Sequence, residues 1–386
     1  MKIANSCLLI AGLAAVLFSC KKSKDAAATP PAPKQLVYAG YSDTALSVGR
    51  RAMAAVALGN KIFFAGGIIE TAISPTAVST ITYSNRVDIY DVQTKQWSFT
   101  TLTHPRGYLA AAAAGSKVIF AGGGAGGAAL RDADIYDTLT GKMTADSLSA
   151  GRYALAGAAA GNKILFAGGA AGAASSAVVD IYDVQTGQWT KSTLSSPRFN
   201  LAGAAAGNTI LFGGGINNNS VILPDVDIYD VQKGTWTQAT LSEARHQLVA
   251  AAAGNKIAFG GGINRMYQSS ATVDVYDTKS GAWSTAALSS PRSRMAAAGI
   301  GDRIVFAGGI SYNDGPTNTM EVYDAQAGKM ISLPYLLKNK RYEPGAAAAG
   351  NTLLVAGGHL QISIYTGSVV ATEYYNYQTV DFFDWK

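Results

Sequence analysis

Short apolar segments recur along the chain in groups of four, and glycines or polar turns separate them. Between residues 155 and 194 the segments are LAGAAAGN, KILFAGG, VDIYD and the stretch from Trp189 to Leu194. No stretch sustains the 3.6-residue apolar period of an amphipathic helix, whereas short apolar runs bounded by Gly and Asn are typical of strands and hairpins. The pattern predicts an all-β fold made of four-stranded units.

The unit occurs seven times. Its third segment is a five-residue motif with acidic and aromatic residues. The motif occurs as VDIYD at 87–91, ADIYD at 133–137, VDIYD at 179–183 and 226–230, VDVYD at 273–277, MEVYD at 320–324 and VDFFD at 380–384. Successive copies start 46, 46, 47, 47, 47 and 60 residues apart, and a glycine pair precedes each of them. Four-stranded units with a period of about 40–50 residues indicate a β-propeller. We therefore predict a seven-bladed β-propeller.

The order of these motifs resembles the kelch repeat: a glycine pair, then a tyrosine after an acid, then a tryptophan. The tryptophans are Trp97, Trp189, Trp236 and Trp283. The resemblance extends over residues 37–386, with Met143 and Met330 in place of tryptophan and Phe383 in place of tyrosine. It implies a kelch-type propeller.

The seventh unit has no fourth segment after its VDFFD motif. The N-terminal stretch from Tyr41 through Leu46 to Arg50 has the same five- and four-residue steps as Trp189, Leu194 and Arg198. We expect this N-terminal strand to complete the last blade, with Tyr41 in the tryptophan position. Such closure leaves no open sheet edge and ties the ends of the ring together.

The N-terminal residues are expected to form a targeting signal followed by a flexible tether. Residues 1–19 read as a signal peptide, and the ending Leu17-Phe18-Ser19-Cys20 resembles a bacterial lipobox, which implies cleavage before Cys20 and a lipid on its thiol. A plain secretory signal is the alternative. Residues 20–36 are polar and rich in Ala and Pro, as in a flexible tether. The expected location is the bacterial cell envelope, at the outer membrane, and Lys21 and Lys22 favour its periplasmic side.

Composition narrows the partners. The net charge of +6 is spread along the chain without a basic run outside the tether, which argues against nucleic acid. The only cysteines are Cys7 and Cys20, so the mature chain forms no internal disulfide. We expect a monomer that meets the membrane only through its lipid.

Two glycine-rich stretches invite nucleotide-binding interpretations, and both fail. Gly122, Gly124 and Gly127 match G-x-G-x-x-G, but a strand rather than a helix follows. The stretch GAAAGNK at 157–163 lacks the Gly-Lys-Ser/Thr ending of a phosphate loop and recurs in every unit. No cofactor is expected. The alanines instead suit the innermost strand of each blade, where space is scarce.

Comparison of the seven units distinguishes loops that belong to the scaffold from loops that are candidates for a binding surface. The turns between first and second and between third and fourth strands hardly vary and share one face, the invariant face. The loops after each glycine pair vary and share the other, variable face with two junction residues that follow a repeated arginine. These junction pairs are Arg51-Ala52, Gly107-Tyr108, Tyr153-Ala154, Phe199-Asn200, His246-Gln247, Ser293-Arg294 and Tyr342-Glu343.

Residues at the two junction positions contact peptide ligands in kelch proteins. The resemblance implies that role for Arg51, Tyr108, Tyr153, Asn200, Gln247, Arg294 and Glu343. The alternative is a set of solvated rim residues. The long loops of units one and seven, at 68–86 and 359–379, add a second candidate surface with Tyr374, Tyr375 and Tyr377. A hairpin that packs these tyrosines on its own blade is the alternative there.

The repeated arginines (50, 106, 152, 198, 245, 292 and 341) occur in every unit, so we expect them to serve the blades by binding backbone carbonyls or an acid such as Asp88. The repeated acids are structural by the same argument.

The predicted function is a lipid-anchored envelope module that binds a protein, peptide or glycan. Only three histidines occur, in separate units and without metal-ligand spacing, and no catalytic residues are assigned. Galactose-oxidase-type kelch enzymes need a cysteine that this propeller lacks. The alternative is a sugar-modifying enzyme similar to a sialic acid mutarotase, with Glu343 and Arg294 as the acting groups.

Overall fold

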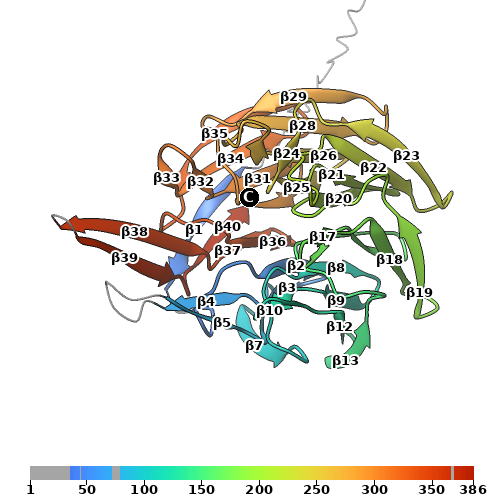
Figure 1. Ribbon diagram of the computed structural model, residues 1–386, viewed down its shortest axis with the longest axis horizontal. Helices are drawn as coiled ribbons and strands as arrows, with labels where there is room; N and C mark the ends of the chain where they lie inside the picture. Colours follow the sequence, from blue (N-terminus) through green and yellow to red (C-terminus); the bar gives the residue numbers. More distant parts are fainter. Residues whose placement is uncertain (1–34, 44, 72–78, 367–368) are drawn as a thin grey trace, which may run out of the picture. The chain divides into compact units, whose positions relative to one another are not determined.

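A ring of seven four-stranded antiparallel sheets makes up the fold (Figure 1). The computed structural model describes residues 35–43, 45–71, 79–366 and 369–386, without the side chains of 332–335 and 362–374. These residues contain strands and turns but no helix. The predicted all-β, seven-bladed propeller is confirmed. The signal peptide, Cys20 and the tether as far as residue 34 lie outside the described residues.

Each blade is a meander that runs from the axis outwards. In that order, the strands of the first three blades are β2 (Ala54–Leu58), β3 (Lys61–Ala65), β6 (Arg86–Asp91) and β7 (Gln96–Thr101); β8 (Ala110–Ala114), β9 (Lys117–Ala121), β12 (Asp132–Asp137) and β13 (Lys142–Ser147); and β14 (Ala156–Ala160), β15 (Lys163–Ala167), β18 (Val178–Asp183) and β19 (Gln188–Thr193).

The next three blades follow the same order. Their strands are β20 (Ala202–Ala206), β21 (Thr209–Gly213), β22 (Asp225–Asp230) and β23 (Thr235–Thr240); β25 (Val249–Ala253), β26 (Lys256–Gly260), β28 (Thr272–Asp277) and β29 (Trp283–Ala287); and β30 (Ala296–Ile300), β31 (Arg303–Ala307), β34 (Thr319–Asp324) and β35 (Lys329–Leu336).

The last blade joins both ends of the described chain. Its strands are β36 (Gly345–Ala349), β37 (Thr352–Ala356), β40 (Val380–Trp385) and, outermost, β1 (Leu36–Ser42). Gln35 and Lys386 exchange backbone hydrogen bonds of 2.6 and 3.0 Å. Closure of the ring by the N-terminal strand is confirmed.

The register of the closing strand differs from the expectation. Tyr38, and not Tyr41, pairs with Phe383 and so takes the place that Trp189 takes opposite Tyr182. The ladder shifts between Tyr38 and Gly40, where Gly40 has a φ of 126°. Tyr38 lies eight residues before Leu46, whereas Trp189 lies five before Leu194. One extra residue belongs to the irregularity and two lie between Ser42 and Leu46, so the five-residue step from Tyr41 gave the wrong equivalence.

Alanine-rich inner strands surround the axis, as predicted. Neighbouring inner strands contact one another around the whole ring, from β2 past β8 to β36 and back to β2. The approach is so close that a Cβ on Gly299 would collide with the carbonyl oxygen of Ala252 in the neighbouring blade. Small side chains are therefore a steric requirement here.

The hydrophobic core is divided among the seven blade interfaces. At the interface of the second and third blades, Ile119 and Ile135 of one sheet pack with Phe166 and Tyr182 of the next. Trp189 covers this cluster from outside, with its ring centroid 5.0 Å from that of Tyr182. Each large side chain buried in this way contributes about 1.5–3 kcal/mol to stability.

The repeated arginines hold the blades internally. Arg106 is fully buried, and its Nε donates to the carbonyl oxygen of Gly122 (2.8 Å). Its Nη2 donates to the carbonyl oxygen of Phe120 (3.1 Å) and to the carboxylate of Asp134 (2.7 Å). A buried charge is tolerated only when it is paired and hydrogen-bonded, because these contacts offset the cost of removing it from water. The arginine–acid pair recurs in every blade, with Glu321 in place of aspartate in the sixth, so the structural role of these arginines and acids is confirmed.

Candidate functional site

The two faces differ in structure as they do in sequence. On the invariant face, aspartates such as Asp183 end the third strand and accept hydrogen bonds from the following turn and from a lysine, here Gln185 N (2.8 Å) and Lys163 Nζ (2.6 Å). The Lys163 contact, with the turn amides, lowers the pKa of Asp183 to about 2. On the variable face, the first junction residue of each unit pairs with the residue after the glycine pair, as Arg51 does with Ile68.

The second junction residues form a closed ring around the axis. Each donates its backbone N–H to the carbonyl oxygen of the second junction residue in the preceding unit, over N···O distances of 2.8–3.3 Å. Its members are Ala52, Tyr108, Ala154, Asn200, Gln247, Arg294 and Glu343.

All seven ring residues have a left-handed backbone, with φ between 51° and 54°. This conformation costs of order 1 kcal/mol for a residue with a side chain. The ring compensates by pairing the N–H and C=O groups of its members with one another, and all seven residues line the mouth of the propeller.

These side chains line a pocket of about 370 Å³ on the variable face, which we call the axial bowl. Its wall contains Tyr108, Tyr153, Asn200, Gln247, Arg294 and Glu343. The structure thus gathers six of the seven junction residues that the sequence singled out. Arg51, the seventh, lies behind the wall and binds two of its members.

One half of the bowl is charged. Arg51 donates from Nη1 to Glu343 Oε2 (2.6 Å) and to the hydroxyl of Tyr108 (3.1 Å), and from Nη2 to Glu70 Oε2 (3.1 Å). On the other side of Glu343, Arg294 Nη1 lies 3.7 Å from Oε1. The carboxylate of Glu343 therefore stands between two guanidinium groups, and the Arg51 guanidinium between two carboxylates. Glu343 in turn raises the pKa of Arg51, so this side chain stays charged.

The other half of the bowl is aromatic and amidic. Tyr108, Tyr153 and Phe199 come from three consecutive units and lie next to Asn200 in the wall. Tyr108 keeps 39% of its surface exposed, and Tyr153 is fixed by a hydrogen bond from its hydroxyl to the carbonyl oxygen of Gly172 (3.0 Å). Burial raises the pKa of Tyr108, which keeps its hydroxyl protonated.

Two histidines near the bowl are buried and neutral. His246 is 8% exposed, and neither ring nitrogen has a hydrogen-bond partner among the described residues. Burial, followed by the nearby Arg294, lowers its pKa to about 4. His359 packs edge-on against Tyr342 (84°, 5.3 Å between ring centroids), and burial lowers its pKa too.

The two long loops form hairpins that lie side by side but outside the bowl. They are β4 (Ile68–Thr71) with β5 (Thr80–Tyr83), and β38 (His359–Thr366) with β39 (Val369–Asn376), and β39 contacts β4 (Figure 1). Tyr375 is 43% exposed on β39, and Tyr377 is half-buried after it. Tyr374 belongs to β39, but its side chain lies outside the described residues.

The sequence did not single out two parts of the site. The first is Glu70, which comes from the first hairpin and pairs with Arg51. The second is the bowl's apolar floor, formed by the residue after each second junction position, for example Leu109, Leu155 and Leu201. The floor could have been predicted from the sequence, because an apolar residue recurs three places after every repeated arginine. Glu70 had none, because its loop occurs once.

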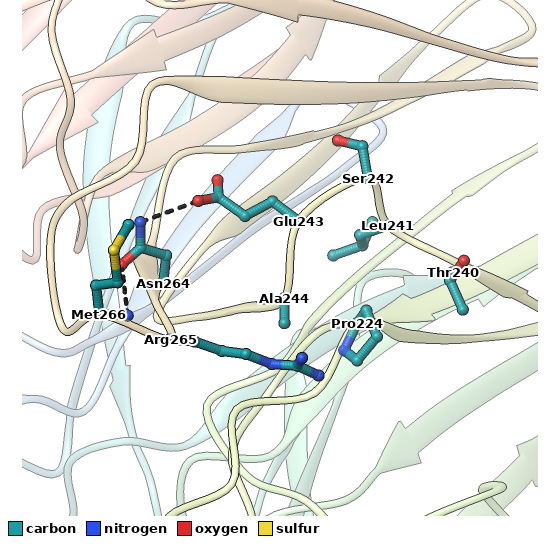
Figure 2. Close-up of a pocket in the computed structure, with 9 residues that line it drawn as sticks. All are labelled: Pro224, Thr240, Leu241, Ser242, Glu243, Ala244, Asn264, Arg265 and Met266. Carbon is teal, nitrogen blue, oxygen red and sulfur yellow. Dashed lines mark hydrogen bonds between the residues drawn. The ribbon is translucent and has the colours of Figure 1, made fainter.

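A second pocket, of about 300 Å³, lies between the loops of the fourth and fifth blades (Figure 2). The Glu243 carboxylate accepts hydrogen bonds from Asn264 (2.9 Å), Ser270 (2.5 Å) and Thr272 (3.1 Å), and Arg265 extends along the pocket towards Pro224. The Glu243 carboxylate is thus engaged by neighbouring side chains of the protein.

No group of three or more His, Cys, Asp or Glu side chains suited to a metal ion occurs in the described part of the chain. The family model of the Kelch motif matches residues 49–101, which span the first blade from β2 to β7. A comparison with curated proteins finds no match. The motif match and the seven-bladed ring together support a kelch-repeat β-propeller, a class that in general serves as a protein-binding scaffold.

Proposed function

We propose that this propeller is a binding module whose ligand, a protein, a peptide or a glycan, docks on the variable face at the axial bowl. One observation carries the proposal: the seven ring residues share one strained backbone geometry but have six different side-chain types. A scaffold that repeats its backbone and varies its side chains at the mouth of a pocket is suited to recognition.

The proposal includes a lipid anchor at Cys20, in the bacterial envelope. Gln35, the first described residue, exchanges backbone hydrogen bonds with Lys386. The backbone N–H of the neighbouring Trp385 donates to the carbonyl oxygen of Asn351, in a turn of the invariant face. The first described residue of the propeller therefore lies on the invariant face, opposite the bowl.

A display experiment tests the binding role. The full chain is screened against phage-displayed peptides and a glycan array, and each binder is retested with Asn200→Ala and Arg294→Met. Matched controls on the invariant face are Asn208→Ala and Lys279→Met, both at exposed positions. We expect binding to weaken only in the first pair. Binders that respond to neither pair, or only to the controls, contradict the proposal.

A further inference from the structure

We infer that the axial bowl binds an uncharged saccharide, whose ring stacks on Tyr108, Tyr153 and Phe199 and whose hydroxyls bond to Asn200, Arg294 and Glu343. This inference rests on the proposed binding role of the bowl and names the class of its ligand. Four features of the bowl lead to it: its charge balance, its open hydrogen-bonding groups, its aromatic wall and its saturated backbone.

The charges of the bowl cancel. Arg51 and Arg294 face Glu343 and Glu70, with ion-pair distances of 2.6, 3.1 and 3.7 Å. An anionic ligand that approaches Arg294 also approaches Glu343 Oε1, 3.7 Å away, and a cationic ligand meets the reverse arrangement. Either ligand loses its hydration without a net attraction in return. An uncharged ligand avoids this cost.

Hydrogen-bonding capacity nevertheless remains in the wall. The Nη groups of Arg294 make no hydrogen bond to the described residues, because its bond to Gln247 uses Nε (2.9 Å). Glu343 Oε1 accepts none within that same part of the chain, since Arg51 binds Oε2. The Asn200 amide adds one acceptor and two donors. Open donors thus lie next to open acceptors, which matches hydroxyl groups that donate and accept at once.

The opposite wall supplies an apolar platform. Tyr108, Tyr153 and Phe199 line this side, with Phe199 also packed against Ile216 and Ile222, and the floor is formed by leucines such as Leu109 and Leu155. A sugar ring has an apolar C–H face and a polar hydroxyl edge. The bowl has the complementary division, with aromatic side chains on one half and polar groups on the other.

The same site suits an extended peptide less well. Peptides that dock on β-structure pair with exposed backbone N–H and C=O groups. Here the ring residues already satisfy one another, with N···O distances of 2.8–3.3 Å. The volume of about 370 Å³ is near the lower end of small-molecule sites, which run from about 300 to 1,000 Å³. Both features favour a compact ligand recognised by side chains.

Saturation-transfer-difference NMR on the full chain tests the inference. The probes are glucose, galactose, mannose and N-acetylglucosamine, with glucuronic acid and a neutral hexapeptide as competing classes. A neutral-oligosaccharide array distinguishes free sugars from the ends of larger glycans. We expect a signal from at least one neutral sugar, about fivefold weaker binding in Asn200→Ala, which loses one neutral hydrogen bond, and about tenfold weaker binding in Arg294→Met, which loses a charge-assisted one.

Asn208→Ala and Lys279→Met are the controls and keep full binding, and circular dichroism verifies that each variant is folded. If only glucuronic acid or only the hexapeptide binds, and Arg294→Met abolishes it, the ligand class is wrong while the binding role of the bowl stands. If no neutral sugar binds in solution or on the array, the inference is overturned. If every binder ignores the bowl variants, the proposed function fails as well.

Discussion

Arg51 and Glu343 lie 292 positions apart in the sequence, and their side chains form an ion pair with Nη1 2.6 Å from Oε2. The pair joins the junction that enters the first blade to the junction that enters the seventh. It therefore crosses the point at which the ring closes. Both side chains are 12% exposed, and Arg51 also contacts Glu70, so the pair both supports closure and shapes the bowl.

Replacement of this arginine is expected to destabilise the fold. Arg51→Met leaves the largely buried Glu70 without its cation and leaves Glu343 with Arg294 alone, 3.7 Å away, so we expect a loss of about 2 kcal/mol in the free energy of unfolding. Urea denaturation measures it. Lys142→Met, at an exposed position on the invariant face, is the matched control. Equal stability of the two variants contradicts the assigned role of the pair.

Stability is expected to fall on mild acidification because of His246. Burial lowers the pKa of this imidazole to about 4, while the unfolded chain titrates near the ordinary value of about 6.5. Between these values the unfolded state binds more protons, so the free energy of unfolding decreases as the pH falls. We expect a decrease of about 2 kcal/mol from about pH 7 to about pH 5. The lowered pKa of His359 acts in the same direction.

Urea denaturation as a function of pH measures this effect, with His246→Phe as the comparison. The phenyl ring needs no hydrogen bonds in a place where the imidazole nitrogens have none among the described residues. The variant keeps its stability near neutral pH and loses less of it on acidification. An unchanged slope between the two proteins would rule out His246 as the source.

The repeated arginines are expected to matter more than any surface charge. Arg106→Met leaves Asp134 without its cation and the carbonyl oxygens of Gly122 and Phe120 without their arginine donor. We expect a loss of about 3 kcal/mol or more, measured by urea denaturation. Arg131→Met is the control, because Arg131 is exposed and makes one hydrogen bond to Ser147 (3.0 Å). A similar loss in both variants would contradict the structural assignment.

The closing strand is expected to be essential, and the segment before it dispensable. A chain that starts at Gln35 keeps β1, whereas one that starts at Asp43 exposes the edge of β40 and removes Leu36 and Tyr38 from the last blade. We expect the first chain to unfold at the same denaturant concentration as the full chain and the second to unfold at a lower one or to aggregate. Equal unfolding midpoints for the two truncated chains would contradict closure by β1.

Repetition explains how much of this architecture the sequence could predict. Seven copies of the same motifs predicted the blades, the inner alanines, the structural arginines and the positions that line the bowl. The left-handed backbone of the ring could not be predicted, because residues such as Tyr108, Asn200 and Arg294 occupy it without the glycine that usually marks such a geometry. Their strain is offset by partners in neighbouring units, which only the closed ring brings together.

Features that occur once were the least predictable. The contact of Arg51 with Glu70 depends on how the β4–β5 hairpin folds, and no second copy of that loop exists for comparison. The register of β1 depends on one extra residue at Gly40 and on two more between Ser42 and Leu46, so a five-residue count back from Leu46 reaches Tyr41 instead of Tyr38. In both cases tertiary contacts decide the position of a residue that local sequence leaves open.

Hydroxyl-radical footprinting with and without a bound ligand tests the central claim most directly, namely that recognition takes place at the axial bowl. The bowl contains the oxidisable side chains Tyr108 and Tyr153, and the rim outside it exposes Met266 and Tyr312. We expect a ligand to protect Tyr108 and Tyr153 from oxidation and to leave Met266 and Tyr312 unchanged. Protection of Met266 and Tyr312 without protection of Tyr108 and Tyr153 would contradict recognition at the bowl.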